Sequence, residues 1–238
     1  IFFTATALAQ TDTRIYDIIQ KVSAKNIEAD ITTLANFGTR NTFSDTLSST
    51  RGIGAARRWI KAEFQQISSI CTNCLEVFYQ KDLVKAATSK RVPKDTWVVN
   101  VVAIQKSKTG SNRYIIISGD IDSRNSDGSD FIKDAPGAND NASGMAGAIE
   151  AARVLSSYEF DANIVYLGLS GEEQGLFGGA GFARYAQENN WDIIGVLNND
   201  MIGNIKGVDG VISNVDFRIF SEPVPPTETQ KQRRLRRF

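Results

Sequence analysis

The chain has 238 residues, 42% hydrophobic and 23% charged, which is typical of a globular protein long enough to bury one large core. Its 27 basic and 27 acidic residues give a formal net charge of +0, which argues against a global field that would recruit nucleic acid or an anionic membrane. The sequence contains no histidine, so the commonest protein metal ligand and the usual general base are both missing.

The first nine residues, IFFTATALA, are uncharged and largely apolar, and they end in a small-x-small pattern. This pattern resembles the end of a secretory signal peptide, so we expect residues 1–9 to be its remnant and the protein to be exported, either secreted or periplasmic. A short buried strand is the alternative interpretation. No other segment approaches the ~20 apolar residues of a membrane span, and residues 10–238 are predicted to form a single domain.

Apolar residues at helical spacing follow this segment. They predict one or two amphipathic helices over residues 15–34 and another helix over Gly54–Ser68, with a polar, turn-rich stretch between them. Cys71 and Cys74 come next, in the sequence CTNC. Two cysteines cannot complete a four-ligand zinc site and no thioredoxin-like frame surrounds them, so we expect a local disulfide, with free or buried thiols as the alternative.

Five apolar segments predict strands. The first two, Leu75–Tyr79 and Trp97–Ile104, flank the sequence KAATSKRVPKD, which predicts an exposed turn. The other three share a form, since each stops at a glycine or polar residue and is followed by acids. They are residues 114–117 before Asp120 and Asp122, residues 164–169 before Glu172 and Glu173, and residues 193–197 before Asp200.

Helical patterns separate these last three segments, about residues 144–152 and 175–187. The alternation predicts an α/β fold, a doubly wound and mostly parallel sheet of buried strands with helices on both faces. Because the loops that follow parallel strands open on one edge of the sheet, the acids should converge there.

A sixth acid, Asp140, lies in the sequence PGANDNASG and is predicted to stand against the start of a helix. Taken singly, each acid is more often a helix cap or a solvated loop residue. Together, so many carboxylates repel one another by several kcal/mol unless cations neutralise them or their pKa values rise. The pattern therefore predicts a divalent metal site.

Four motifs, in this order and spacing, carry a family resemblance: GDIDSR, PGANDNASGMAGAIEAARVL, LSGEEQGLFG and NNDMIG. From about Thr39 to Phe220 the sequence resembles the M28 family of zinc exopeptidases, the co-catalytic metallo-aminopeptidases. The resemblance implies two zinc ions and a peptide substrate. It also implies roles for four acids: Asp140 bridges the ions, Asp200 binds the first, Glu173 binds the second, and Glu172 is the general base.

The sequence departs from the family pattern at two places. The family has His-x-Asp after the first of these strands, whereas this chain has Asp120 and Asp122. Asp120 can replace the histidine as a metal ligand and would tilt the preference toward Mn, Mg or Co. Asp122, which takes the family's catalytic position beside that ligand, has no imidazole to orient.

The second departure concerns the C-terminal part, where the family supplies its last histidine ligand. We expect the chain to be truncated before that ligand, with residues 222–238 as a disordered tail, and its activity to be impaired or lost while the full-length parent is a peptidase.

The leading hypothesis is an exported metallo-exopeptidase that removes N-terminal residues from peptides, without nucleic-acid or membrane partners. A carboxypeptidase or a glutaminyl-cyclase-like acyl transferase on the same fold is an alternative, as is a non-catalytic binding domain. A metal-dependent glycosyltransferase reading of Asp120 to Asp122 is disfavoured, because the GEE and NNDMIG segments have no place in such an enzyme. The oligomeric state is not predicted.

Overall fold

The computed structural model describes residues 12–215 and 219. It divides into two compact units, the first ending at Gly203 and the second beginning at Asn204. In the second unit the described residues form a short turn closed by an antiparallel bridge between Lys206 and Ile212. The predicted signal-peptide remnant (1–9) and the predicted tail (222–238) lie outside the described residues.

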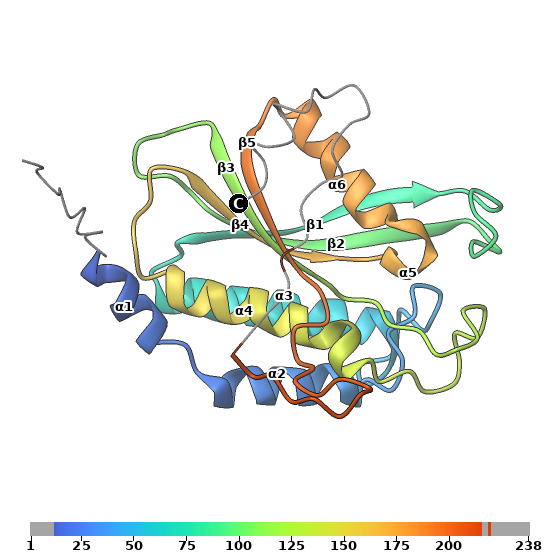
Figure 1. Cartoon of the computed structure of the whole chain (residues 1–238). Coiled ribbons are helices and arrows are strands. Elements are labelled where there is room, and N and C mark those ends of the chain that lie inside the picture. The colour runs from blue at the N-terminus through green and yellow to red at the C-terminus, as the bar shows by residue number, and fades with distance from the viewer. Residues whose placement is uncertain (1–11, 216–218, 220–238) are drawn as a thin grey trace, which may run out of the picture. The chain divides into compact units, whose positions relative to one another are not determined.

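One sheet of five strands, in the order β1-β2-β4-β3-β5, forms the centre of the first unit (Figure 1). The strands are β1 Leu75–Val84, β2 Thr96–Gln105, β3 Arg113–Asp120, β4 Asn163–Leu169 and β5 Asp192–Asn199. β3 pairs in parallel with β4 and β5, and β2 pairs antiparallel with β1 and β4. The α/β class is confirmed, and every strand except β2 runs in the same direction.

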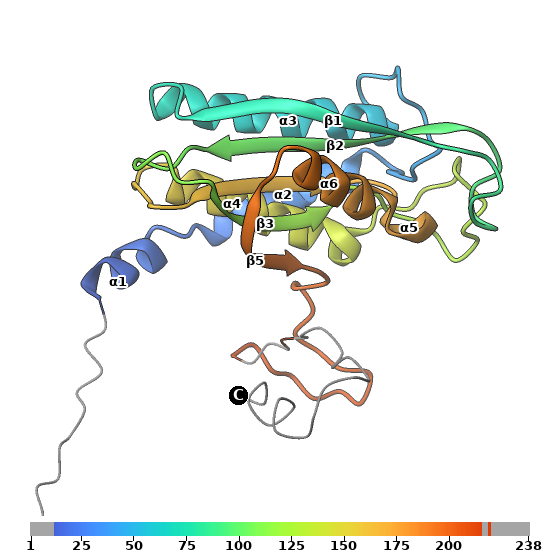
Figure 2. The ribbon, with the colours of Figure 1, turned by 90° about the horizontal axis from the view of Figure 1, so that it is seen from above.

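Helices cover both faces of the sheet, as predicted. The helices are α1 Thr13–Gln20, α2 Ala24–Asn36, α3 Gly52–Ile70, α4 Gly144–Leu155, α5 Glu172–Gly175 and α6 Phe177–Glu188, and a π-type turn, η1 Ala138–Ser143, precedes α4. Figures 1 and 2 show α2, α3 and α4 on one face and α6 on the other. Each face has its own apolar core, one around Phe64 and Tyr166 and one around Phe182.

The apolar spacing along α3 explains how this helix seats on the sheet. Its fully buried residues Ile53, Ala56, Ile60 and Phe64 recur every three or four positions and therefore form one stripe. At the end of β3 the approach is closer still. A Cβ on Gly119 would lie 2.5 Å from the backbone of Gly144, so only glycine lets the start of α4 touch the end of β3.

Two predictions about the strands are wrong. β5 was expected to be buried, but it is an exposed edge strand: Ile193, Val196 and Leu197 are 38%, 57% and 60% exposed. Within the described part of the chain β5 pairs with β3 alone. β1 extends to Val84, because its alternating half-polar sequence hides the continuation that pairing with β2 imposes.

The predicted local disulfide is present between Cys71 and Cys74, at the junction of α3 and β1. No helix among residues 12–215 has both the length and the apolar character of a membrane span.

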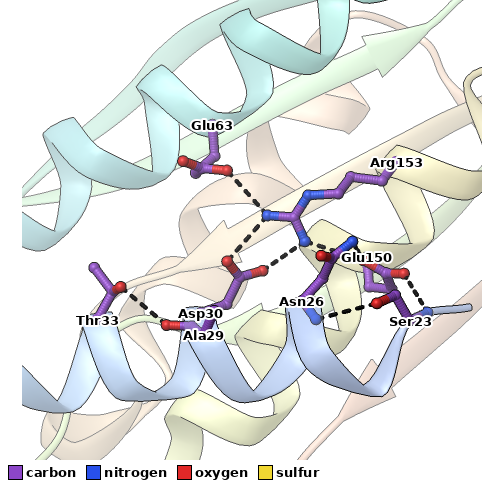
Figure 3. Close-up of polar contacts among 8 residues, drawn as sticks. All are labelled: Ser23, Asn26, Ala29, Asp30, Thr33, Glu63, Glu150 and Arg153. Carbon is purple, nitrogen blue, oxygen red and sulfur yellow. Dashed lines mark hydrogen bonds and ion pairs between the residues drawn. The ribbon is translucent and has the colours of Figure 1, made fainter.

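A polar network joins α2, α3 and α4 on the face of the sheet that they cover (Figure 3). The Arg153 guanidinium of α4 lies 2.7 Å from Asp30, 2.9 Å from Glu63 and 3.0 Å from Glu150. Glu150 also accepts the backbone N–H of Ser23 at 2.7 Å, at the start of α2. One cation therefore ties together three helices through three carboxylates.

Candidate functional site

A cavity of about 660 Å³ opens at the ends of β3, β4 and β5. Such a volume falls within the range of small-ligand sites. Four of the six predicted acids line it, namely Asp140, Glu172, Glu173 and Asp200. They come from η1, from α5 and from the loop after β5, so the sheet brings together residues that are far apart in the sequence.

Glu172 and Glu173 form the first turn of α5, directly after β4. Gly171 before them has φ 75°, a left-handed conformation that favours glycine and turns the chain sharply. Burial, followed by repulsion from Asp122, raises the pKa of Glu172 to about 7. Burial also raises the pKa of Glu173, opposed by the Arg124 guanidinium, whose Nε donates to the Glu173 carboxylate.

Asp140 is an exposed residue of η1, and its loop is held from behind by a buried arginine. The Arg40 guanidinium is fully buried and donates to the carbonyls of Pro136 at 2.6 Å and Gly137 at 3.0 Å. It also donates to Ile121 O at 2.8 Å. Arg40 thereby fastens the loop that carries Asp140 to the loop that follows β3.

Asp200 lies just beyond β5, and the residues after it are bonded to η1. Met201 N donates to the Asn141 side chain at 3.3 Å, and Ile202 N donates to Ser143 Oγ at 3.1 Å. Burial and the nearby Asp140 raise the pKa of Asp200.

Asp120 is 5% exposed at the end of β3 and does not line the cavity directly. Its carboxylate accepts the Asn141 side-chain N–H at 2.9 Å, and the same amide donates to Asn199 O at 2.9 Å. Burial, followed by repulsion from Asp122, raises the pKa of Asp120 to about 7. Glu172 and Asp200 repel it as well, which places Asp120 at the edge of the same charge cluster.

Asp122 lies behind the cavity and is only 2% exposed. It accepts the backbone N–H groups of Glu172 at 3.2 Å and Glu173 at 3.1 Å, and the Thr42 hydroxyl at 3.3 Å. Burial raises the pKa of Asp122, opposed by these backbone bonds and by the Arg57 charge. Asp122, predicted as catalytic, thus contacts the backbone of the two glutamates from behind the cavity.

The donor set suits a divalent cation. Carboxylate oxygens are hard ligands. Burial, followed by repulsion from neighbouring carboxylates, raises the pKa values of Glu172, Glu173 and Asp200, and a bound cation would stabilise their charged forms. Among the described residues no three acids already have the spacing of a closed metal site. Glu173, for example, is turned toward Arg124.

Four residues that line the cavity were not predicted from the sequence as site residues. Ser89, Lys90 and Arg91, from the loop between β1 and β2, line it together with Arg124. Their segment was predicted only as an exposed turn. No local signal points to the cavity, because the loop precedes Glu172 by some eighty residues and lacks a motif.

Residues 100–216 match the family model described as Peptidase family M28. A relative named "Probable zinc metalloprotease", from Pyrenophora teres f. teres (strain 0-1), is 36% identical over 217 residues, which cover 91% of this chain and 47% of that protein. The chain thus spans about half the length of this relative.

Two solved structures share the fold. LapB from Legionella pneumophila has a TM-score of 0.62 and 20% identity, over 80% of this chain and 46% of that one. Fimbriiglobus ruber glutaminyl cyclase has a TM-score of 0.57 and 17% identity, over 74% of this chain and 60% of that one. At these identities the two structures support a shared fold only, and the chemistry has to be inferred from the residues of the site.

Proposed function

The chain belongs to peptidase family M28, and from that membership we propose that it carries the main catalytic residues of a zinc-dependent exopeptidase acting on the N-terminal bond of peptides. The observation that carries the proposal is the cavity at the strand ends, lined by Asp140, Glu172, Glu173 and Asp200. Four carboxylates that face one cavity suit a cation-binding site better than a neutral ligand.

We propose zinc as the metal because the relatives are named probable zinc metalloproteases. Asp140, Glu173 and Asp200 would hold it, with Asp120 beside them as the replacement for the family's first histidine. Bound zinc would supply Lewis acidity, which polarises a peptide carbonyl and acidifies water. Two ions are the expectation from the family, and Mn or Co are alternatives because the ligands are oxygen atoms.

Glu172 is the proposed general base. Its carboxylate faces the cavity, and its pKa of about 7 lies where a group exchanges protons at neutral pH. The Glu172 carboxylate would take the proton of the attacking water and return it to the leaving amine. Asp122, bonded to the backbone of both glutamates, would keep Glu172 and Glu173 pointing in different directions.

A second candidate is a non-catalytic binding domain that kept the fold and lost the metals. The absence of histidine from this sequence favours it, because histidine is the commonest protein metal ligand. Export of the protein remains a proposal, and the Cys71–Cys74 disulfide supports it.

Metal content of the purified chain after dialysis against zinc-free buffer tests the proposal. We expect bound zinc in the wild type, loss of it in Asp140→Ala, and retention of it in Asp161→Ala, a control acid whose side chain is 75% exposed. Glu172→Gln should keep the metal and lose the hydrolysis of aminoacyl anilides. Retention of zinc by Asp140→Ala at the wild-type level would refute the site, and a wild type that binds no zinc would favour the second candidate.

A further inference from the structure

The cavity has a cationic wall that the proposed hydrolysis leaves without a role. Lys90, Arg91 and Arg124 line it together with the acids contributed by η1, by α5 and by the loop after β5. Among the described residues only Arg124, of these three cations, pairs with an acid.

Hydrogen bonds place this wall immediately beside the two glutamates. Arg91 Nη1 donates to Glu173 O at 2.6 Å, and Ser89 Oγ donates to Gln174 O at 2.9 Å. Figures 1 and 2 show the tip of the β1–β2 hairpin beside α5. These two bonds therefore hold the loop that carries Lys90 at the edge of the turn formed by Glu172 and Glu173.

The charges on this wall are only partly compensated. Arg124 pairs with the Glu173 carboxylate. The Arg91 guanidinium donates to a backbone carbonyl, and neither it nor the Lys90 ammonium forms an ion pair with any acid of the described part of the chain. Lys90 has no hydrogen-bond partner there either. Arg91 and Arg124 stabilise the turn of Glu172 and Glu173 through their bonds to Glu173. Lys90 makes no such contact with the described residues.

From this arrangement, and resting on the proposed peptide hydrolysis, we propose that Lys90, Arg91 and Arg124 form a carboxylate-binding subsite for the substrate. Guanidinium and ammonium groups recognise carboxylates through charge-assisted hydrogen bonds. A peptide that carries a carboxylate close to the cleaved bond matches both walls, with its amine toward the acids and its carboxylate toward the cations. That carboxylate is either an acidic side chain after the cleaved bond or the C-terminus of a dipeptide.

Three substrates separate the two sources: Leu-Gln-Ala-amide, which has no carboxylate, Leu-Glu-Ala-amide, which has an acidic side chain, and the dipeptide Leu-Gln. We expect at least one of the two carboxylate substrates to be hydrolysed with a kcat/KM about tenfold above the amide that lacks one. Lys90→Met should reduce that preference severalfold, mainly through KM. The matched control is Lys94→Met, an exposed lysine of the same loop that lies over the Phe131 ring and does not line the cavity.

Equal kcat/KM for all three substrates, or the same preference in Lys90→Met, would overturn the subsite while leaving the proposed hydrolysis intact. No hydrolysis of any substrate would instead count against the proposed function. In that case binding decides the subsite: fluorescence titration of zinc-loaded Glu172→Gln with the same peptides should show tighter binding of a carboxylate peptide, weakened by Lys90→Met and unaffected by Lys94→Met. Equal binding of all three peptides would refute it.

Discussion

Asp122 is the residue whose role the structure changes most. In the family pattern it accompanies a histidine, but here its carboxylate accepts two backbone N–H groups of the turn that carries Glu172 and Glu173. A buried acceptor with two donors fixes the direction in which that turn leaves β4. Asp122 thus acts on the site through the backbone of its neighbours and does not touch the cavity.

Asp122→Ala is expected to weaken zinc binding and to lower the free energy of unfolding by about 1–3 kcal/mol, because two buried N–H groups lose their acceptor. Asp122→Asn keeps an acceptor oxygen and should lose less. Zinc titration and urea unfolding of both variants measure the effect. Wild-type zinc affinity and wild-type stability in both variants would show that the turn does not depend on Asp122.

The stability of the metal-free protein should depend on pH in a specific direction. The pKa values of Asp120 and Glu172 are raised to about 7, whereas carboxyls in an unfolded chain titrate near ~4. Between these values the folded state binds more protons than the unfolded state, so raising the pH lowers the free energy of unfolding.

EDTA-treated protein should therefore unfold at a lower temperature at pH 7.5 than at pH 5. Asp120→Asn, which removes one of the two titrating carboxyls, should reduce the difference. Calorimetry at the two pH values measures it. A melting temperature that rises between pH 5 and pH 7.5, with no change in the variant, would contradict the raised pKa of Asp120.

Five of the six acids could be predicted from sequence because each follows an apolar segment that the local pattern identifies, whereas Asp140 was found through the sequence PGANDNASG. The loop residue Lys90 could not, because its place depends on a hairpin whose docking on α5 involves a backbone carbonyl of Glu173. A backbone acceptor leaves no trace in the sequence. Asp122, like Asp120, was identified because it follows the apolar segment of β3. Its contacts with Glu172 and Glu173 could not be predicted, because they are made to backbone N–H groups.

At the scale of elements, the Arg153 network determines how α2, α3 and α4 pack together (Figure 3). The side chains of Asp30 and Glu150 are 7% and 4% exposed, and that of Arg153 is 20% exposed. Three carboxylates that lose their one cation in such surroundings repel one another with little solvent screening.

Arg153→Met should lower the free energy of unfolding by about 3 kcal/mol at pH 7. The loss should shrink at pH 5, because carboxyls without their cation bind protons more readily. Urea unfolding at both pH values measures it. Arg58→Met is the control: Arg58 is an exposed arginine of α3 that donates only to loop carbonyls, so its variant should lose far less at pH 7. Equal losses in the two variants would refute the network's role.

Within the residues that the structure describes, the outer edge of β5 is unpaired and apolar, and such an edge is a template for another strand, so we expect it to promote association. Leu197→Lys should reduce light scattering by concentrated protein. Leu47→Lys, at a loop leucine that is 90% exposed, makes the same charge change away from the sheet and should have little effect. Equal scattering by wild type and Leu197→Lys would show that β5 is not the adhesive element.

The type of each helix or strand was easier to predict than its exposure to solvent or its direction in the sheet. The segments now seen as β3, β4, α3 and α6 were predicted because their apolar spacing matches one period. The exposure of β5 could not be predicted from the sequence. An apolar segment has the same pattern whether or not other elements cover the strand that it forms. The reversed direction of β2 follows from a hairpin joined by eleven residues, Lys85–Asp95, in which the turn glycines of tight hairpins are missing.

At the scale of the whole molecule, every acid of the site lies in the unit that ends at Gly203. The hydrogen bonds described above around these acids are also made within that unit, as is the bond of Gly203 N to Asn139 Oδ1 at 2.9 Å. The site is therefore a property of one unit.

A chain ending at Gly203 should keep the metal content and the melting temperature of the longer chain. Metal analysis and thermal unfolding of the two chains compare them directly. A chain that ends at Asn199 provides the contrast, because it lacks Asp200 and the bonds of Met201 and Ile202 to η1. Equal metal content in that shorter chain would show that Asp200 is not a ligand.

The order of strands in the sheet has a consequence for synthesis on the ribosome. β3 ends at Asp120, but its partner β5 ends at Asn199, 79 residues later (199 − 120). At a translation rate of roughly 5–20 residues per second, one edge of β3 waits about 4–16 s for its partner. During that interval β3, which is an interior strand of the completed sheet, has an open side. The nascent chain should therefore be a client of chaperones that hold extended apolar segments until β5 is made.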